Sequence, residues 1–217
     1  MILEVLKALA DQSRLRLTAI LLRGEFTVQE LTRIMGTGQS RVSHHLKVLT
    51  EAGILAVKRQ GTWSYYRAGG PSPFFAAICS AVEQGLAELP EREQDLAAMA
   101  NVLEERRKRS QEFFDRHARQ WDDLARTLLP APEYRESLLS RIPEGMTVVE
   151  IGLGTGGLLP ALAARSAAII GVDHSPAMLE EARRRLADGH VRLLGGRGDA
   201  FVAASWPEAG VAGIGPP

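Results

Sequence analysis

The chain has 217 residues, of which 26 are Lys or Arg, 26 are Asp or Glu and 45% are hydrophobic. This composition excludes a disordered or collagen-like chain, and the length predicts one or two globular domains. The first residues turn polar before a signal-peptide core can form, and no apolar run approaches the roughly 18 residues of a membrane helix. Because Cys79 is the single cysteine, no internal disulfide can form. We therefore expect a protein of the cytoplasm.

The zero net charge conceals an uneven distribution of charge along the chain. Residues 1–70 hold ten basic and five acidic residues, a net charge of +5, whereas residues 71–145 carry −4 and residues 146–217 carry −1. A basic N-terminal third on an otherwise neutral protein predicts a local surface that binds a polyanion.

The N-terminal third has the pattern of three short helices. Apolar residues recur at helical spacing over residues 15–22, and two further helices are expected over residues 28–35 and 39–52. Residues 36–38, Gly-Thr-Gly, form a tight turn between the last two helices. Two short helices joined by a three-residue turn with glycine predict a helix-turn-helix, in which the second helix is presented to DNA.

The faces of this second helix follow from a rotation of about 100° per residue. Val42, Leu46 and Leu49 fall on one side and must face the core, so the opposite side presents hydroxyl, imidazole and cationic groups. Such groups suit phosphate oxygens and the base edges of the major groove. The DNA contacts expected from this helix are Gln39, Ser40, Arg41, Ser43, His44 and Lys47. His45 falls on the inward side, where we expect a packed, hydrogen-bonded histidine.

Two β-prone runs, residues 55–59 and 62–67, flank a Gln-Gly turn and predict a hairpin. Lys58, Arg59 and Gln60 lie at its tip, where the cations can neutralise phosphates beside the helix. The alternative is a winged helix used only for protein contacts. That alternative would leave the row of donors and the local positive charge without a purpose.

Over residues 9–68 the chain resembles the winged-helix domain of the ArsR family of bacterial regulators. The resemblance implies a homodimer that binds a palindromic operator in double-stranded DNA and is released by a ligand. In the metal-sensing branch of the family, a cysteine pair lies in the first helix of the motif. The matching residues here, 26–35, contain no cysteine, so we do not expect metal sensing at that position.

The middle of the chain is predicted to be helical. A Gly- and Pro-rich break at residues 69–73 precedes a helix over 74–89, where the resemblance places dimer packing. A helical pattern then continues over about residues 91–129, although residues 104–112 are entirely polar. We interpret the basic run at residues 106–109 as a solvated connector, with a second DNA-contacting patch as the alternative.

A second signature begins with an apolar strand over residues 147–151, which leads into the glycine-rich residues 152–157 and a helix. Glycines at such a corner let the backbone approach a ligand closely, and the helix start offers free N–H groups. A second apolar strand over residues 168–172 ends in Asp173, whose carboxylate can accept both hydroxyl protons of a ribose. These features alone are also compatible with a site that binds a dinucleotide cofactor.

The longer segment of residues 148–186 resembles the opening half of class I S-adenosylmethionine-dependent methyltransferases. The resemblance implies that S-adenosylmethionine or S-adenosylhomocysteine binds here. The implied contacts are Glu150 at the methionine end, Gly152, Gly154 and Gly156 along the cofactor, Asp173 at the ribose, Met178 near the adenine, and Asp199 and Ala200 at the adenine amino group. An apolar stripe with Phe114 and Trp121 resembles the helix that covers the cofactor in this family, with plain helix packing as the equal alternative.

Residues 146–217 supply three strands and at best a fourth near 211–214, fewer than a full domain of this family. We therefore expect a partial module, and no catalytic residue and no metal ligand is assigned. Catalysis is not expected from this chain, although the methyltransferase signature leaves the question of an enzyme open.

The expected fold is α+β followed by α/β. Residues 1–70 form a winged helix-turn-helix that binds DNA, residues 71–128 form dimerisation and connector helices, and residues 129–217 form a partial Rossmann-like, doubly wound methyltransferase module. The predicted function is an ArsR-type repressor whose C-terminal module binds the cofactor as an effector. The alternatives are a methyltransferase with a regulatory DNA-binding domain, and a truncated product with a working DNA-binding half.

Overall fold

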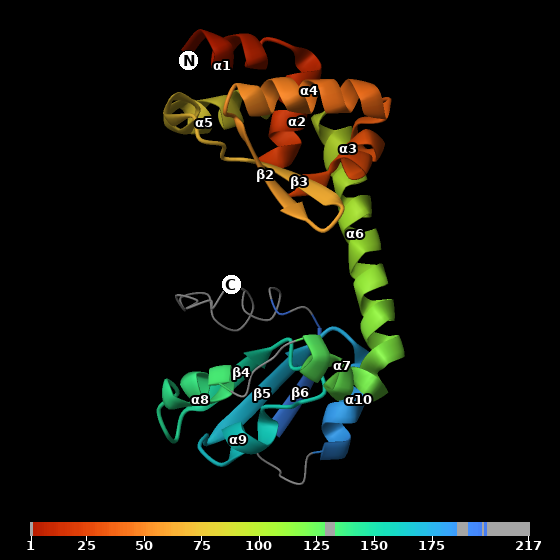
Figure 1. The fold of residues 1–217 in the computed structure, drawn as a ribbon, viewed down its shortest axis with the longest axis vertical. Coiled ribbons are helices and arrows are strands. Elements are labelled where there is room, and N and C mark those ends of the chain that lie inside the picture. The colour runs from red at the N-terminus through yellow and green to blue at the C-terminus, as the bar shows by residue number, and fades with distance from the viewer. Residues whose placement is uncertain (1, 129–132, 186–190, 197, 199–217) are drawn as a thin grey trace. The chain divides into compact units, whose positions relative to one another are not determined.

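A computed structural model describes residues 2–128, 133–185, 191–196 and 198 (Figure 1). The chain forms two compact units, Met1–Arg106 and Arg107–Pro217. Helix α6 (Arg92–His117) runs from the first unit into the second. None of the helices in the described ranges is long and apolar enough to cross a membrane.

The first unit is built on five helices besides α6. They are α1 (Ile2–Leu9), α2 (Gln12–Leu21), α3 (Val28–Met35), α4 (Gln39–Glu51) and α5 (Pro73–Leu86). Helix α2 begins after Asp11, whose side chain accepts a hydrogen bond from the Arg14 backbone N–H. Helix α3 begins with a reciprocal pair of bonds between Thr27 and Glu30, a capping box. Helix α3 ends at Gly36, whose φ of 62° is accessible to glycine without strain.

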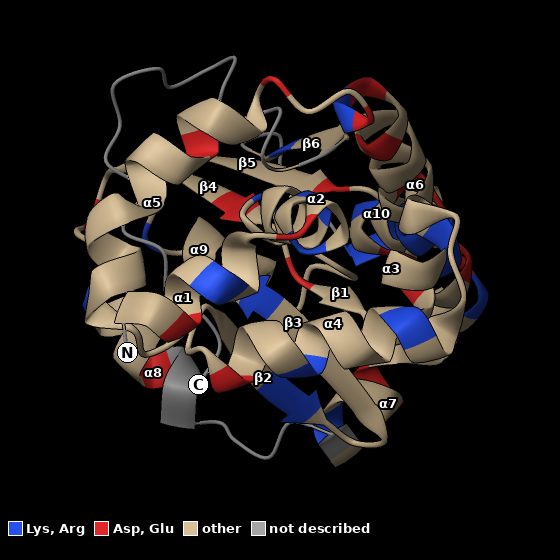
Figure 2. Cartoon of the chain, turned by 90° about the horizontal axis from the view of Figure 1, so that it is seen from above, with Lys and Arg blue, Asp and Glu red and all other residues tan. Residues whose placement is uncertain are grey.

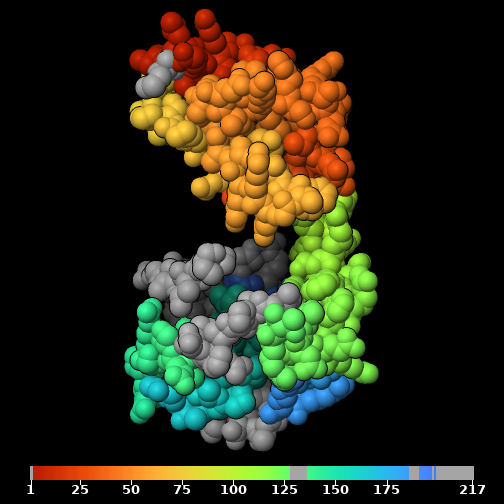
Figure 3. All heavy atoms as spheres, viewed as in Figure 1, coloured from red at the N-terminus to blue at the C-terminus, as the bar shows by residue number. Residues whose placement is uncertain are grey.

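A three-stranded antiparallel sheet completes the first unit. Its strands are β1 (Phe26–Thr27), β2 (Leu55–Gln60) and β3 (Trp63–Ala68), in the order β1-β3-β2. The hairpin of β2 and β3 confirms the predicted wing, and it projects from the surface of this unit in Figure 3. Strand β1 was not expected, because two residues are too few to show the alternation of apolar and polar residues that predicts a strand.

The core of the first unit lies between the helices and one face of the sheet. Leu17, Leu31 and Phe26 are fully buried there. Val42, Leu46 and Leu49 of α4 are also buried, as their spacing predicts. Helix α6 adds Val102 to the same core, so its first half packs with the other helices of the first unit.

The second unit contains a parallel sheet with helices. Its strands are β4 (Thr147–Ile151), β5 (Ala168–Asp173) and β6 (Val191–Gly195), in the order β4-β5-β6. Its helices are α7 (Trp121–Leu128), α8 (Glu133–Ser140), α9 (Leu159–Ala163) and α10 (Pro176–Arg185). Parallel strands joined by helices confirm the expected partial Rossmann-like module. The fourth strand expected near residues 211–214 lies outside the described residues.

Two helix boundaries differ from the sequence prediction. The helix expected over residues 74–89 ends at Leu86. The long helix expected to reach residue 129 ends at His117, where φ and ψ of −104° and 2° leave the α-helical region. A 3₁₀ turn, Ala118–Gln120, follows before α7, so the polypeptide changes direction before the cofactor signature.

Candidate functional site

The outer face of α4 and the tip of the hairpin form a surface of donors on the first unit. The inner face of α4 is fixed by its three core residues, so the opposite face is exposed to solvent. All nine side chains expected to contact DNA are exposed: Gln39, Ser40, Arg41, Ser43, His44, Lys47, Lys58, Arg59 and Gln60. Figure 2 shows Lys and Arg positions along α4 and on β2.

A groove of about 540 Å³ lies between α4 and the hairpin. It is lined by Ser43, Lys47, Thr50 and Glu51 from α4 and by Val57, Arg59, Ser64 and Tyr66 from the strands. The sequence analysis assigned only Ser43, Lys47 and Arg59 of this set. The alternation of side chains along β3 could have identified Ser64 and Tyr66, since residues two apart share one face of a strand.

Lys47 forms a weak ion pair with Glu51. The Lys47 Nζ lies 3.8 Å from the Glu51 Oε1, and both side chains are mostly exposed. Such exposed pairs one helical turn apart contribute only about 0.3–0.5 kcal/mol. Lys47 can therefore exchange this carboxylate for a phosphate at little cost.

His45 is half-buried and faces inward from α4. Its Nδ1 lies 3.9 Å from the Asp11 Oδ1, and burial lowers the pKa of the imidazole. That nitrogen has no hydrogen-bond partner in the described part of the chain, so the prediction that it is hydrogen-bonded is wrong. A separation of 3.9 Å is too long for a hydrogen bond between these two atoms.

Arg106 does not belong to a solvated connector, which corrects the interpretation of residues 106–109. Its Nε donates to the Glu30 Oε1 at 2.6 Å, and its Nη2 donates to the Glu25 carbonyl at 3.0 Å. The guanidinium also lies over the Phe26 ring, 5.1 Å from its centroid. Arg106 thus ties α6 to the start of α3. These contacts could not be predicted from the sequence, because they join residues far apart in the chain.

The glycine-rich corner of the second unit borders a pocket of about 420 Å³. Small-molecule sites typically enclose about 300–1,000 Å³. Gly152 and Gly154 line the pocket, with φ of 76° and 59°, a region that residues with a Cβ rarely occupy. Gly156 is buried beside the corner instead, where an added Cβ would lie 2.6 Å from the Leu159 Cδ1.

Asp173 ends β5 at the edge of this pocket and holds the glycine corner. Its Oδ2 accepts a hydrogen bond from the Gly154 N–H at 2.7 Å, and its Oδ1 accepts one from the Ser175 N–H at 2.9 Å. A carboxylate has about four acceptor positions, so two remain for other donors. Glu150 and Met178 also line the pocket, whereas Asp199 and Ala200 lie outside the described residues.

Side chains that precede the sheet cover part of the pocket. Phe114 and Trp121 line it and meet edge to face, with ring centroids 5.1 Å apart. Asp122 of α7 accepts a hydrogen bond from the Thr155 hydroxyl at 2.6 Å and pairs with Arg185 of α10. Burial would raise the pKa of Asp122, but the hydrogen bonds from Arg185 and Thr155 lower it. Asp122, Thr155 and His174 line the pocket and were missed in the sequence.

The end of α6 binds the loop that follows Asp173. The Asp115 Oδ1 accepts a hydrogen bond from the Ser175 hydroxyl at 2.5 Å and a longer one from the Ala177 N–H at 3.3 Å. Ser175 is fully buried, and its hydroxyl oxygen also accepts the Met178 N–H. Asp115 therefore fixes the start of α10 beside the pocket.

These residues fit an adenosine-containing ligand. The positive-φ glycines allow close approach of the backbone, the buried Asp173 keeps acceptor capacity for a diol, and two aromatic rings offer surfaces for stacking. Within the described ranges, no group of three or more His, Cys, Asp or Glu side chains is arranged to hold a metal ion.

Two family models match separate parts of the chain. The model described as "Bacterial regulatory protein, arsR family" matches residues 11–57, and the model described as "Methyltransferase domain" matches residues 148–208. The first match contains α2 to α4 and the start of β2. The second contains the glycine corner and Asp173.

The curated relatives resemble the N-terminal part of the chain. The arsenic resistance transcriptional regulator ArsR1 of Pseudomonas putida is 48% identical over 64 residues, which are 29% of this chain and 50% of that protein. The arsenical resistance operon repressor of Bacillus subtilis is 48% identical over 28% of this chain and 58% of that protein. An uncharacterised HTH-type transcriptional regulator of Methanocaldococcus jannaschii is 34% identical over 29% of this chain and 72% of its own length. The match thus spans 50% and 58% of the length of the first two relatives.

Proposed function

The chain belongs to the ArsR family of bacterial regulatory proteins through its N-terminal part, and we propose that it is a DNA-binding transcriptional repressor with a ligand-sensing C-terminal unit. The observation that carries the proposal is the exposed donor face of α4 beside the projecting hairpin. Hydroxyl, imidazole and cationic groups gather there, while the opposite face of α4 is sealed in the core. The major groove of DNA admits an α-helix and presents hydrogen-bonding groups that such a row of donors can contact.

The DNA contacts divide by chemistry. Arg41, Lys47, Lys58 and Arg59 neutralise phosphates, which provides affinity without sequence preference. Gln39, Ser40, Ser43 and His44 lie on the first turns of α4 and contact base edges, which provides the specificity. The groove between α4 and the hairpin accommodates the backbone strand between these two sets.

The repressor acts as a homodimer. Ile2, Leu3 and Leu6 of α1 expose apolar side chains to solvent, with exposed fractions of 56%, 67% and 47%. Such a patch on a regulatory domain is a candidate protein interface. A second copy of the chain covers this patch and the neighbouring α5, where the family resemblance places dimer packing, and two-fold symmetry then presents two copies of α4 to a palindromic operator.

The effector is S-adenosylmethionine or S-adenosylhomocysteine, bound at the glycine corner. Asp173 accepts the ribose hydroxyls, Glu150 lies at the methionine end, and Met178 lies against the adenine. Asp173 would hold the ligand beside the loop that continues to Ser175, and binding would change DNA affinity only if the ligand bound the two DNA-binding states of the protein unequally.

Helix α6 is the physical link in this proposal. One of its side chains, Asp115, holds the loop after Asp173, and another, Arg106, holds the start of α3. A rotation or shift of α6 that follows a change at Ser175 would reach the capping box of the helix-turn-helix. In this proposal, the contacts of α6 with α3 and with the loop after Asp173 are sufficient to connect the ligand pocket to the helix-turn-helix.

Selection of duplexes from a random pool by the purified full chain tests the DNA-binding role. We expect enrichment of a palindromic sequence that the wild type binds and the double variant Arg41→Gln, Lys47→Gln does not. An Arg183→Gln variant, changed on the exposed face of α10, should select the same sequence. Failure of the wild type to enrich any sequence contradicts the proposal.

Methyl transfer is the second candidate function, favoured by the methyltransferase model that matches residues 148–208. Catalysis of this kind depends mainly on holding donor and acceptor together. Calorimetric titration with both nucleosides, followed by transfer from isotopically labelled S-adenosylmethionine, separates the two functions. A sensor binds ligand and transfers no methyl group to protein, DNA or small-molecule acceptors.

A further inference from the structure

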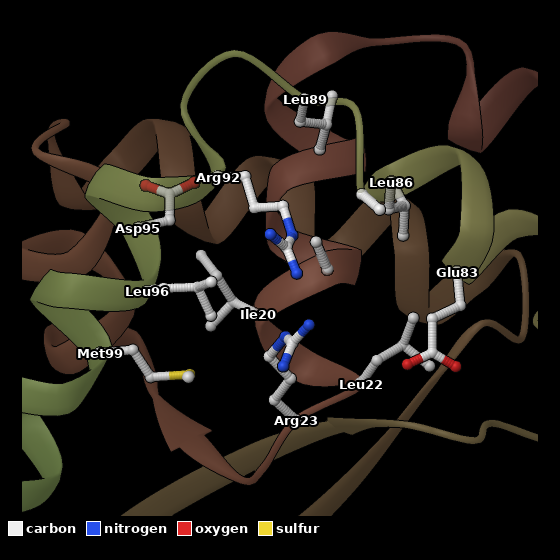
Figure 4. Close-up of a pocket in the computed structure, with 12 residues that line it drawn as sticks. Ile20, Leu22, Arg23, Glu83, Leu86, Leu89, Arg92, Asp95, Leu96 and Met99 are labelled. Atoms are coloured by element: carbon white, nitrogen blue, oxygen red, sulfur yellow. The ribbon is translucent and has the colours of Figure 1, made fainter.

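The first unit packs its aromatic side chains against the core, with one exception. Phe26 and Phe75 are buried, and the cavity that Figure 4 shows between α2, α5 and α6 encloses only about 40 Å³. Trp63, by contrast, is 49% exposed, and it is the one exposed Phe, Tyr or Trp among the described residues of this unit. Tryptophan is highly buried on average and is enriched among the residues that dominate binding, so an exposed one is a candidate contact for a partner.

Trp63 lies at the projecting end of the hairpin. It pairs with Gln60, and a two-residue turn separates them. Strand β1 pairs with β3 at Tyr66 and Tyr65, so the two residue pairs nearer the turn extend beyond the third strand. These two pairs and the turn together project by roughly 10 Å, at about 3.4 Å per residue. The minor groove of DNA is about 7.5 Å deep, so this end of the hairpin is long enough to enter it.

The two faces of the hairpin have different surroundings. One face borders the groove beside α4, and its side chains are Val57, Arg59, Ser64 and Tyr66. Side chains alternate along a strand, and directly paired residues share a face. The opposite face, near the turn, therefore presents four other side chains: Lys58, Gln60, Trp63 and Tyr65. Lys58 pairs with Tyr65 and Gln60 pairs with Trp63, so a cation and an amide lie beside two aromatic rings.

The chemistry of this opposite face suits the minor groove of A·T-rich DNA. A·T pairs present only acceptors there, and the exposed Gln60 amide can donate to them. A narrow A·T-rich minor groove has an enhanced negative potential, which favours a cation such as Lys58 at its rim. Apolar side chains that enter the minor groove wedge between base steps and bend the duplex. Trp63 provides such an apolar side chain at the end of the hairpin.

We propose that Trp63 enters the minor groove next to the half-site contacted by α4, where it favours A·T-rich sequence and bends the duplex. This inference rests on the proposed DNA-binding function. Arg59 and Ser64, on the other face, stay with the phosphates beside α4, so the two faces of one hairpin contact two parts of the duplex. The surface that contacts DNA is then continuous from α4, through the groove, to the end of the hairpin.

Sequence preference at the flanks of the selected duplex tests the position of Trp63. We expect the wild type to select A·T pairs there, and Trp63→Ala to lose that preference while it keeps the central sequence contacted by α4. Replacing the flanking adenines by diaminopurine adds an amino group to the minor groove and leaves the major groove unchanged. This replacement should weaken binding by the wild type about tenfold, and binding by Trp63→Ala less than about twofold.

Bending of the same duplex gives a second readout that a purely structural role of Trp63 would not change. In gel shifts with circularly permuted duplexes, the wild type should bend the DNA, Trp63→Ala should bend it less, and Trp63→Phe should retain most of the bend. Phe113→Ala, which removes an exposed aromatic ring from the second unit, should behave as the wild type does. Thermal unfolding shows that each variant is folded before it is assayed.

The outcomes separate this inference from the proposed function. Selection of no duplex by the wild type refutes both. If the wild type selects a duplex, but Trp63→Ala shows the same flanking preference, sensitivity to diaminopurine and bend, DNA binding stands and the role of Trp63 is overturned. If Trp63→Ala changes none of these measurements but weakens self-association in sedimentation, the exposed ring contacts a second copy of the chain, and the inference is likewise refuted.

Discussion

The guanidinium of Arg106 and the carboxylate of Glu30 form a two-point ion pair, and the same carboxylate caps the start of α3. The Glu30 Oε2 accepts hydrogen bonds from the Thr27 N–H and the Thr27 hydroxyl, each at 2.8 Å. Its other oxygen accepts from the Arg106 Nε at 2.6 Å. One carboxylate therefore joins the helix-turn-helix to α6, and α6 continues to the pocket of the second unit.

Loss of Arg106 should destabilise the first unit. Arg106→Gln leaves Glu30 partly buried with one charged partner fewer, and a hydrogen bond to a charged group contributes about 1.5–3 kcal/mol. We discount this for the partial exposure of Arg106 and expect the free energy of unfolding to fall by about 1–2 kcal/mol. Urea denaturation followed by circular dichroism measures the change. Arg116→Gln, an exposed position on the same helix, serves as the control, and an equal effect of both variants would refute the assigned role.

The acid stability of the protein should depend on Glu30. Burial alone would raise the pKa of Glu30, but hydrogen bonds from Arg106 and Thr27 lower it from 4.5 to about 2. The unfolded chain takes up this proton first as pH falls, so the stabilisation is complete above about pH 5 and is lost progressively towards pH 2. Between pH 6 and pH 3, we expect Glu30 to account for about 1–2 kcal/mol of the loss.

Urea denaturation of the wild type and of Glu30→Gln at a series of pH values tests this dependence. The variant lacks the titrating group, so its stability should decline less steeply over the same range. Carbon-13 NMR titration of the Glu30 carboxyl gives the pKa directly. Parallel pH profiles for the two proteins, with a normal carboxyl titration, would show that the ion pair has no influence on the folded state.

The salt dependence of DNA binding should identify the phosphate contacts. Each phosphate neutralised contributes a slope of about −0.9 to the logarithm of affinity against the logarithm of salt concentration. Lys47→Gln should reduce that slope by about one for each copy of Lys47 that contacts DNA, and Arg59→Gln should do the same. Ser43→Ala should leave the slope unchanged but relax the preference for the selected sequence. Fluorescence anisotropy measures both quantities, and an unchanged slope in Lys47→Gln would place that side chain off the DNA.

Asp173 should control ligand affinity. Asp173→Asn removes the charge that we propose accepts the ribose hydroxyls and weakens the bond to the Gly154 N–H, so the affinity for S-adenosylhomocysteine should fall by about 10- to 100-fold. Asp123→Asn, a mostly exposed position on α7, is the matched control. Calorimetric titration gives both dissociation constants. Wild-type affinity in Asp173→Asn would mean that the ligand does not bind through its ribose at this strand end.

The regular elements of the site could be predicted from the sequence because they depend on local periods. The spacing of Val42, Leu46 and Leu49 fixed the inner face of α4 and thereby its exposed face. The glycine between two β-prone runs predicted the hairpin, although its turn consists of Gly61 and Thr62 rather than Gln60 and Gly61, because Gln60 pairs with Trp63 at the end of β2. The strand, glycine corner and acidic strand end were likewise readable, since each depends on residues close together in the chain.

Contacts between distant segments could not be predicted in this way. The capping pattern of Thr27 and Glu30 is visible in the sequence, but nothing near it indicates that Arg106 binds the same carboxylate. Asp115 and Asp122 looked like ordinary helical surface residues, and only the tertiary fold brings them to Ser175 and Thr155. Contacts between side chains that are far apart in the sequence leave no periodic pattern of residues from which they could be predicted.

The most direct test of the account is the affinity of the selected duplex for the full chain with and without saturating S-adenosylhomocysteine or S-adenosylmethionine. We predict that one of the two ligands changes the dissociation constant by at least about fivefold. We also predict that Asp115→Asn, which weakens the bond from α6 to Ser175, reduces this change while leaving ligand-free DNA binding intact. An identical dissociation constant at every ligand concentration, in a protein that calorimetry shows to bind the ligand, would contradict the coupling.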